Sequence, residues 1–201
     1  GFGSHWLVPD RQSHWWIEYN RGLYAVCARL IKAHPNVIFQ ACGSGGGRMD
    51  YGIMRYCHEF WPSDNTDAFD RIFIQWGAGY FYPAMSIAAH VSAAPNHQTG
   101  TMLPLKFRFD TAASARLGFE LRKESLSKNE VEFIRSAVDV YKRVIRPLVT
   151  NGDLYRISSP YGEQGIAALS YVSPKKDRAV AFLYVLRYRP RLDYPVLKFR
   201  G

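Results

Sequence analysis

The chain has 201 residues, with 26 Lys and Arg against 17 Asp and Glu for a formal charge of +9, and it is 47% hydrophobic and 15% aromatic. This composition excludes intrinsic disorder, because so much apolar surface must be buried, and the length predicts one large domain or a domain with a small partner. The longest apolar runs have only a few residues, against the ~18 needed to cross a bilayer, so we expect no membrane-spanning segment.

Several classes of site are disfavoured by what the motifs lack. The three cysteines, Cys27, Cys42 and Cys57, contain no C-x-x-C pair, so a disulfide framework and a structural zinc site are excluded, and the sequence predicts a mechanism without metal or cofactor. Lys and Arg are spread along the chain except for a run at 187–191, which we interpret as a solvated segment. We therefore expect no nucleic-acid partner.

The first predicted elements are a helix, a strand and a glycine-rich loop. Apolar residues at helical spacing predict an amphipathic helix over 18–33. The apolar run 37–39 is typical of a parallel strand covered on both faces, and it leads into the glycines of 42–48. Arg48 follows these glycines where a phosphate-binding loop has Gly-Lys, which excludes a nucleotide site. A tight turn and a close approach to a ligand both stay open for this loop.

The same alternation of strand, loop and helix then repeats. We predict a strand at 59–62, a helical stripe from Phe69 to Trp76, one or two buried strands within 80–91, a polar loop at 95–101 and a strand at 116–121. A Ser127–Glu130 capping box begins a helix that is expected to end at Pro147. Repeated βα units favour an α/β fold with a parallel sheet.

After residue 149 the pattern changes to strands alone. The segments 154–157, 166–172 and 179–188 predict an antiparallel sheet. The sequence thus predicts two units, residues 1–148 and residues 149–201. Because four βα units are half of an eight-unit barrel, and because Gly1 opens the chain without an initiator Met, we expect a piece of a longer protein.

The candidate chemical groups each have an alternative structural explanation. Ser63 or Asp64 is expected to cap the following helix, with Asp67 and Arg71 forming an exposed pair, but Asp64 beside Trp61 would also suit a proton donor. Two further residues are ambiguous in the same way, and for both a structural role is favoured over a functional one. Cys42 suits a small packed residue better than a nucleophile, and His97, with Asn96 and Gln98, suits a hydrated loop better than a sugar site. Most of the five tryptophans should lie in the core.

Three ordered motifs carry a resemblance to a known family. They are Cys42–Asp50 with its glycine run, Trp61–Asp67 with the sequence Trp-Pro-Ser-Asp-Asn-Thr-Asp, and His90–Ser92 followed by Pro95–Gly100. In this order and spacing they resemble glycoside hydrolase family 36, the α-galactosidases of melibiose and raffinose breakdown, over residues 1 to about 185.

The resemblance implies a fold and a reaction. The chain would be the C-terminal half of a (β/α)8 TIM-type barrel followed by a small, incomplete antiparallel β domain. The reaction would be retaining hydrolysis of terminal α-linked galactose, with an α-galactoside oligosaccharide as the substrate and no cofactor. Asp64 matches the family's general acid/base, and Cys42 and Gly45 match positions that line the galactose pocket.

Some of the family's pattern is missing. Its nucleophile is the Asp of a Lys-x-Asp motif on the preceding barrel strand; we expect no such motif in this chain, and Asp10 does not match it. We therefore expect the missing N-terminal part to supply the nucleophile and the isolated chain to be inactive. Thr101 stands where the family commonly has Arg, which affects a subsite. A raffinose-synthase-like transglycosylase, an α-N-acetylgalactosaminidase and a non-catalytic carbohydrate-binding fragment stay open, as do a homo-oligomer and the compartment.

Overall fold

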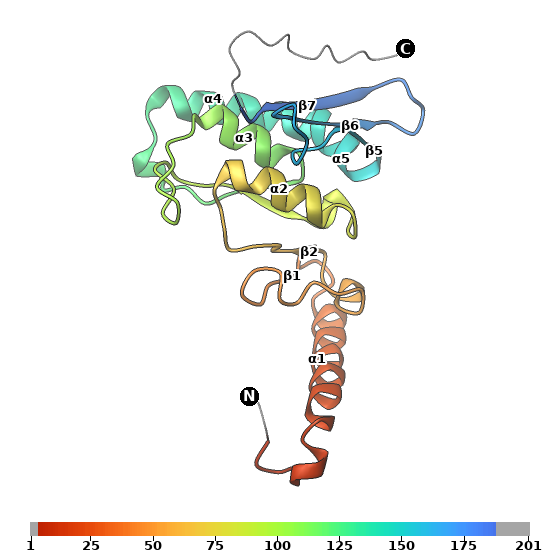
Figure 1. Cartoon of the computed structure of the whole chain (residues 1–201). Coiled ribbons are helices and arrows are strands. Elements are labelled where there is room, and N and C mark those ends of the chain that lie inside the picture. Colours follow the sequence, from red (N-terminus) through yellow and green to blue (C-terminus); the bar gives the residue numbers. More distant parts are fainter. Residues whose placement is uncertain (1–3, 188–201) are drawn as a thin grey trace.

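The computed structural model describes residues 4–187. Its helices are α1 (His14–Ala33), α2 (Ala68–Ala78), α3 (Leu105–Ala113), α4 (Lys128–Val140) and α5 (Arg146–Asn151), and its strands are β1 (Gln40–Ala41), β2 (Glu59–Phe60), β3 (Ala88–Val91), β4 (Arg116–Phe119), β5 (Asp153–Ser158), β6 (Ile166–Val172) and β7 (Ala179–Val185). Figure 1 shows α1 projecting away from the other helices, with β1 and β2 between them. No helix in this part of the chain is long and apolar enough to cross a membrane.

The first four strands are short and parallel. β1 pairs with β2 and β3 pairs with β4, and a parallel bridge from Phe60 to Ile87 connects the two pairs. A helix follows each of β2, β3 and β4, so the α/β alternation that the sequence predicts is present. A polar contact also crosses these strands, because Glu59 accepts a hydrogen bond from Gln40 and forms an ion pair with Arg116. Because the strands are parallel, their carboxyl ends lie at the same edge of the sheet.

The predicted strand at 37–39 is wrong. The strand begins only at Gln40, and Val37 and Ile38 are 48% and 55% exposed. The physical reason is that α1, the helix that would have to cover this strand, has no buried residue. It packs near β1 and β2 only through partly buried side chains such as Leu23. An apolar run gives a covered strand only where a partner layer reaches it. Within 80–91 one of the one or two predicted strands forms, β3, preceded by a short 3-10 turn at Ala84–Ser86.

The long helix after the capping box does not end at Pro147. The reciprocal Ser127 and Glu130 hydrogen bonds are present, which confirms the predicted start, but α4 continues through a π-helical turn, Tyr141–Ile145, into α5. Proline lacks an N–H and its ring collides with the carbonyl four residues earlier. The wider π turn directly before Pro147 places this residue in the first turn of α5, where no N–H is needed.

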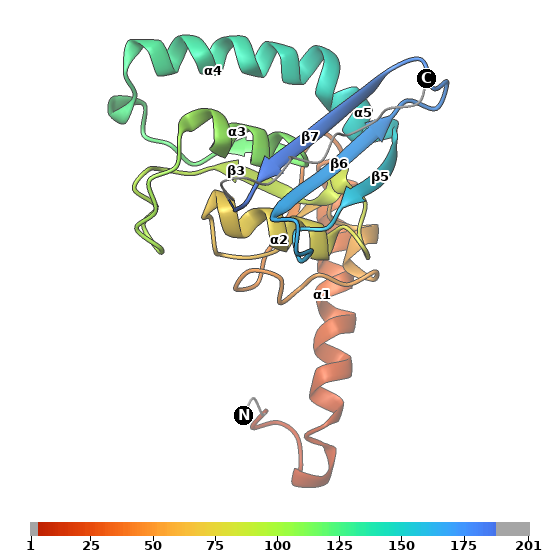
Figure 2. The same ribbon diagram turned by 45° about the horizontal axis from the view of Figure 1, so that its top comes forward.

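The antiparallel sheet forms as predicted, in the order β5, β6, β7. Figure 2 shows it lying beside α2 and α3, with α5 behind it and α4 along the top of the molecule. The main core is continuous between the two parts, because buried residues of α2, α3 and β3 share one cluster with residues of β6 and β7. The cluster includes Ile72, Val91, Phe109, Tyr141, Leu148, Ala167, Tyr171, Phe182 and Tyr184. The predicted boundary near residue 149 thus crosses a shared core.

The expectation that most tryptophans are buried is wrong. Trp61 and Trp76 lie in the interior, whereas Trp6 is 95% exposed, Trp16 is 51% exposed and Trp15 is half-buried. The three outer tryptophans lie on or before α1, the helix that contributes no buried residue.

Candidate active site

The glycine-rich loop is a compact turn at the carboxyl end of β1. Ser44 and Gly45 have φ values of 53° and 68°, in the left-handed region that glycine adopts without strain. A bridge joins Gly43 to Gly46, and a Cβ on Gly47 would lie 2.3 Å from the carbonyl oxygen of Gly43. The loop therefore needs several glycines to close on itself.

This loop packs directly against the segment that carries Asp64. A Cβ on Gly45 would lie 3.0 Å from Cα of Ser63 and 3.1 Å from the backbone N of Asp64. On Gly46 it would lie 2.8 Å from the carbonyl oxygen of Pro62. Because β1 and β2 are adjacent and parallel, the two loops leave the sheet at the same edge, and the glycines allow their backbones to touch.

The Asp64 side chain is exposed and oriented by Trp61. Its Oδ1 accepts a hydrogen bond of 3.1 Å from the indole Nε1 of Trp61. The Trp61 ring is itself buried between partners: its centroid lies 4.5 Å from that of the His90 ring and 4.7 Å from Cζ of Arg71. The carboxylate of Asp64 is thus exposed to solvent, while its Oδ1 is held by a hydrogen bond from a fixed aromatic donor.

The predicted helix cap is wrong by three residues. Neither Ser63 nor Asp64 caps α2; the cap is Asp67, whose Oδ1 accepts from the backbone N of Phe69 and of Asp70. The chain between Asp64 and the helix is taken up by a turn in which Asn65 Oδ1 accepts from the backbone N of Asp67. Asp64 is consequently free of the capping role that competes with a catalytic one.

The expected exposed pair of Asp67 and Arg71 does not exist. Both residues are only 2% exposed, and they point to different partners. Arg71 donates to the carbonyl oxygens of Ser63 and Ala88, whereas Asp67 accepts from the hydroxyls of Thr99 and Thr101. The reason is that this face of α2 is covered by β3 and the 95–101 loop.

The environment of Asp67 favours its charged form. Burial alone would raise the pKa of Asp67, but the hydroxyls of Thr101 and Thr99 and the backbone N–H groups of Phe69 and Asp70 outweigh it, so the pKa lies below its usual range. Thr101, where the resemblance implies an Arg, is one of the two hydroxyl donors to this carboxylate.

The 95–101 loop divides its polar side chains between two directions. Asn96 is buried and donates to Thr66 Oγ1, and Gln98 Oε1 accepts from the backbone N of Thr66. His97 is exposed and lines a hollow of about 560 Å³ between this loop and residues 119–125. Asn96 and Gln98 thus fasten the loop to the Asp64 segment, whereas His97 faces the hollow.

Cys42 is exposed, so the prediction that it is a small packed residue is wrong. The ring of His90 packs on Trp61. Burial lowers the pKa of His90, with a smaller lowering from Arg71 and opposing effects of Glu120 and Glu59. The exposed thiol at the start of the glycine loop suits a surface that faces a ligand.

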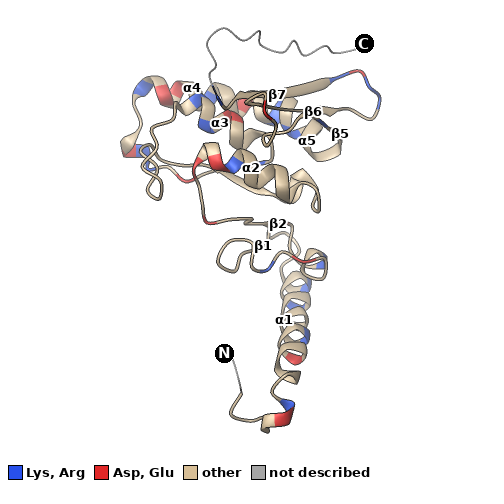
Figure 3. Ribbon diagram, viewed as in Figure 1, with Lys and Arg blue, Asp and Glu red and all other residues tan. Residues whose placement is uncertain are grey.

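Other chemical groups lie away from this edge. The expectation that the chain has no Lys-x-Asp motif is wrong, because Lys175–Asp177 has this spacing. This run lies in the turn between β6 and β7, where Asp177 accepts from the hydroxyl of Ser173, and not on a barrel strand. Between residues 4 and 187 no three His, Cys, Asp or Glu side chains gather to hold a metal ion. Lys and Arg are scattered over most elements and interspersed with acidic residues (Figure 3), without a continuous basic face in that view.

One residue of this site, Arg71, could not be identified from the sequence. Arg71 fits the spacing of a surface ion pair with Asp67, and only the course of the chain brings it under Trp61. The indole donor of Trp61, by contrast, stands three residues before Asp64, and that spacing was a usable signal.

Comparison with known proteins gives a consistent result. Residues 2–152 match the Melibiase family. The chain is 41% identical over 180 residues to alpha-galactosidase 1 of Pediococcus pentosaceus, and 41% identical over 185 residues to alpha-galactosidase AgaA of Geobacillus stearothermophilus. These alignments cover 90% and 92% of this chain but only 24% and 25% of those proteins, so the chain spans about a quarter of the length of its relatives.

Solved structures agree with this match. The alpha-galactosidase from Lactobacillus brevis superposes with a TM-score of 0.92 at 39% identity, over 98% of this chain and 27% of that one. A variant of AgaA in complex with raffinose superposes with a TM-score of 0.93 at 36% identity, over all of this chain and 28% of that one. The chain belongs to the melibiase family, as its resemblance to glycoside hydrolase family 36 predicts.

Proposed function

We propose that this chain is part of a retaining α-galactosidase that hydrolyses terminal α-linked galactose from oligosaccharides such as melibiose or raffinose. Asp64 is the general acid/base, and Cys42 and Gly45 line the galactose pocket. The observation that carries the proposal is the contact between the glycine loop and the Asp64 segment, where Gly45 meets the backbone of Ser63 and Asp64. A complex of AgaA with raffinose supports the substrate class.

The chemistry requires two carboxyl groups about 5 to 5.5 Å apart. A nucleophile attacks the anomeric carbon while Asp64 donates a proton to the glycosidic oxygen, and Asp64 then takes a proton from the water that releases galactose. The exposed tip of Asp64 suits this exchange, and its hydrogen bond from Trp61 fixes the direction of the carboxylate. The exposed thiol of Cys42 suits a closely bound sugar, and the lack of a side chain on Gly45 lets the loop lie directly against the Asp64 segment.

The nucleophile belongs, in this proposal, to sequence outside these 201 residues. Two observations support this: the only Lys-x-Asp run lies in a β6–β7 turn, and the chain matches only about a quarter of its relatives. Four parallel strands joined in sequence order also suit the C-terminal half of a (β/α)8 barrel, with residues 1–148 as that half and residues 149–201 as part of the β domain.

The test uses the α-galactosidase polypeptide that contains this chain, with Asp64→Ala as the variant. We expect kcat/KM for raffinose to fall by about 10²- to 10⁴-fold, because protonation of the leaving oxygen is lost. A 2,4-dinitrophenyl α-galactoside needs little protonation, so its kcat/KM should fall far less. Azide should then accelerate turnover and give α-galactosyl azide, since it needs no general base. Asp139→Asn, an exposed carboxylate paired with Arg143, is the control and should change neither value.

Equal losses for both substrates without azide rescue would remove Asp64 from the acid/base role. The isolated 201-residue chain should be inactive toward either substrate. Its tryptophan fluorescence should not change when it is titrated with galactose. A saturable response of the isolated chain would favour a carbohydrate-binding fragment. Galactosyl transfer to sucrose, or a preference for an N-acetylgalactosaminide, would indicate the transglycosylase or the α-N-acetylgalactosaminidase.

A further inference from the structure

Arg71 is a buried cation beneath the turn that carries Asp64. It is 2% exposed, and none of the hydrogen-bond partners recorded for it within residues 4–187 is a carboxylate. Burial lowers its pKa to about 10, so the guanidinium still carries its charge at neutral pH. A buried charge without a counterion is costly, and an apolar side chain of similar volume often stabilises a protein more. Stability alone therefore gives no reason for an arginine here.

The contacts of Arg71 converge on the two groups that fix Asp64. Its Nη1 donates to the carbonyl oxygen of Ser63 at 3.2 Å, which belongs to the peptide that immediately precedes Asp64. Its Cζ lies 4.7 Å from the centroid of the Trp61 ring, and this ring donates through Nε1 to Asp64 Oδ1. A third contact, from Nη2 to the carbonyl oxygen of Ala88, anchors the guanidinium to β3.

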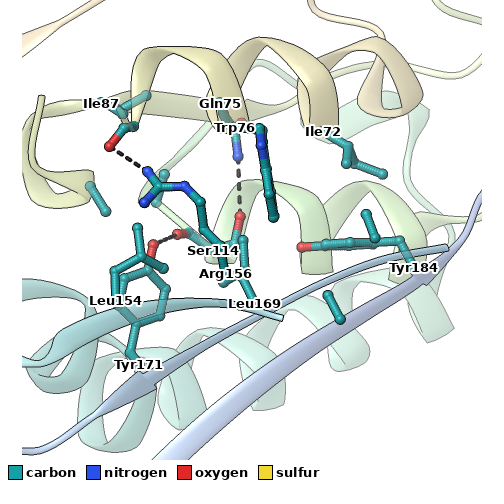
Figure 4. A pocket seen from close by; sticks show the side chains of 15 residues that line it. Ile72, Gln75, Trp76, Ile87, Ser114, Leu154, Arg156, Leu169, Tyr171 and Tyr184 are labelled. Carbon is teal, nitrogen blue, oxygen red and sulfur yellow. Dashed lines mark hydrogen bonds between the residues drawn. The ribbon is translucent and has the colours of Figure 1, made fainter. Parts of the chain in front are cut away.

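The position of Arg71 is supported from the side opposite to Asp64. Gln75, one turn later on α2, accepts from Nε of Arg71 at 3.4 Å and donates to Thr111 O and Ser114 Oγ at 3.0 and 3.1 Å. The carbonyl of Ser114 in turn accepts from the hydroxyl of Tyr171 on β6 at 2.7 Å. Figure 4 shows Gln75 reaching down to Ser114 and Tyr171 reaching up to the same residue. A line of hydrogen bonds thus runs from the antiparallel sheet to the Asp64 turn.

We propose that Arg71 is a positioning residue for proton transfer by Asp64, acting through the Trp61 ring and the Ser63 carbonyl; this rests on the proposed acid/base role of Asp64. A general acid must lie within about 2.6–3.2 Å of the oxygen that it protonates. Arg71 holds both the backbone and the side-chain donor that set this distance. Its loss should impair protonation of the leaving group and leave the first attack on an activated substrate nearly intact.

The test compares substrates in the α-galactosidase polypeptide that contains this chain. Arg71→Met removes the charge and the donors, and Trp61→Phe keeps a ring and removes only the N–H to Asp64. For both variants we expect kcat/KM for raffinose to fall about 10-fold or more, and kcat/KM for a 2,4-dinitrophenyl α-galactoside to fall less than about 3-fold. Arg71→Lys keeps the charge but not the planar guanidinium group. Its kcat/KM for raffinose should therefore lie between those of Arg71→Met and the parent.

Arg108→Met is the matched control. Arg108 is also buried, at 7% exposed, and also donates to backbone carbonyls, those of Ser92 and Leu103, but it contacts neither Trp61 nor Ser63 among its recorded partners. Any loss of activity in Arg108→Met should be the same for both substrates. The ratio of the two kcat/KM values therefore separates positioning of Asp64 from a general loosening of the fold.

The outcomes are distinct. An equal fall for both substrates in Arg71→Met, or unchanged activity toward raffinose, overturns the proposal. If Arg71→Met does not fold, the same ratio in Arg71→Lys and Trp61→Phe decides it. A lack of leaving-group dependence in Asp64→Ala overturns the acid/base role itself, whereas leaving-group dependence in Asp64→Ala but not in the Arg71 variants overturns only the role of Arg71.

Discussion

Asp67 shows how a buried carboxylate ties two loops together. It caps α2 and accepts from the hydroxyls of Thr99 and Thr101, so both the 95–101 loop and the helix depend on its negative charge. The pKa of this carboxyl is lowered on folding by those donors despite burial. Its contribution to stability is therefore complete above the unfolded pKa of about 3.9, and it is lost as the pH falls through the lower folded value.

Asp67→Asn should accordingly destabilise the protein by about 2 kcal/mol at pH 7, the usual worth of hydrogen bonds to a charged group. The difference from the parent should shrink as the pH falls through the lowered pKa of Asp67, because the parent carboxyl then becomes protonated too. Urea unfolding at pH 7 and below pH 4 measures both values. Asp139→Asn, which touches only the exposed Arg143, should stay within about 0.5 kcal/mol at either pH. A difference that persists undiminished in acid would contradict this account.

Gly45 is required for close contact as well as for its backbone angle. Its φ of 68° disfavours any side chain, and an added Cβ would meet backbone atoms of Ser63 and Asp64 that have no flexible way to yield. Gly45→Ala should therefore push the two loops apart and lower kcat/KM for raffinose by about 100-fold, since small displacements of reacting groups have effects of this size.

Gly100→Ala separates the two causes. Gly100 has a φ of 73°, but nothing lies within 4 Å of its added Cβ. Gly100→Ala should lower the free energy of unfolding by about 1 kcal/mol, the usual cost of a non-glycine residue with left-handed backbone angles. Its effect on kcat/KM should be much smaller than that of Gly45→Ala. Similar kinetic losses in both variants would show that the angle, rather than the contact with Asp64, matters.

At this scale the sequence could identify groups but not their directions. The motifs selected Asp64 and Gly45 as residues of one site, and the structure does bring their backbones together. The same motifs misassigned Asp67 and Arg71 to an exposed pair, because i, i+4 spacing is identical on a solvated face and on a covered one. Which face is covered depends on β3 and the 95–101 loop, which are distant in sequence.

Among the elements, α4 begins where its local sequence dictates. Ser127 Oγ accepts from the backbone N of Glu130, and the Glu130 carboxylate accepts from the Ser127 backbone N–H, so the helix start is fixed by residues within one turn. Ends without such local signals were harder to predict. Pro147 is a breaker in isolation, but the π turn before it, supported by the buried hydroxyl of Tyr141 on Ala115 O and Leu117 N, carries the helix past it.

Ser127→Ala should lower the free energy of unfolding by about 1 kcal/mol, because the first-turn N–H of Glu130 loses its acceptor. Ser136→Ala in the same helix is the control: its hydroxyl donates only to the carbonyl of Glu132, one turn earlier and exposed. Alanine favours a helix interior by roughly 0.5 kcal/mol over serine, so this variant should be neutral or slightly more stable. Equal destabilisation by the two substitutions, measured by urea unfolding, would argue against the cap.

Over the whole molecule, the two predicted units are joined by polar contacts as well as by the core. Arg156 on β5 lies 4.3 Å from the Tyr80 ring centroid and donates to the carbonyl of Gly79 at the end of α2. Tyr171 on β6 donates to Ser114 O in the α3–β4 turn, and both residues line a cavity of about 30 Å³. The change of sequence pattern near residue 149 correctly marked a change of sheet type, but patterning within segments carries no information on contacts between them.

The helices α2 and α3 and the antiparallel sheet should therefore unfold together. Tyr171→Phe leaves the buried Ser114 carbonyl without that donor, so we expect a loss of about 1–2 kcal/mol. Because the core is shared, the helical circular dichroism signal and the resistance of the β5–β7 region to proteolysis should be lost at the same urea concentration. This concentration should be lower than for the parent protein. Tyr155→Phe, at a ring 49% exposed on β5, should change neither. A sheet that becomes protease-sensitive while the helical signal persists would mean that the shared core does not couple the two parts, and the boundary at residue 149 would then separate units that unfold independently.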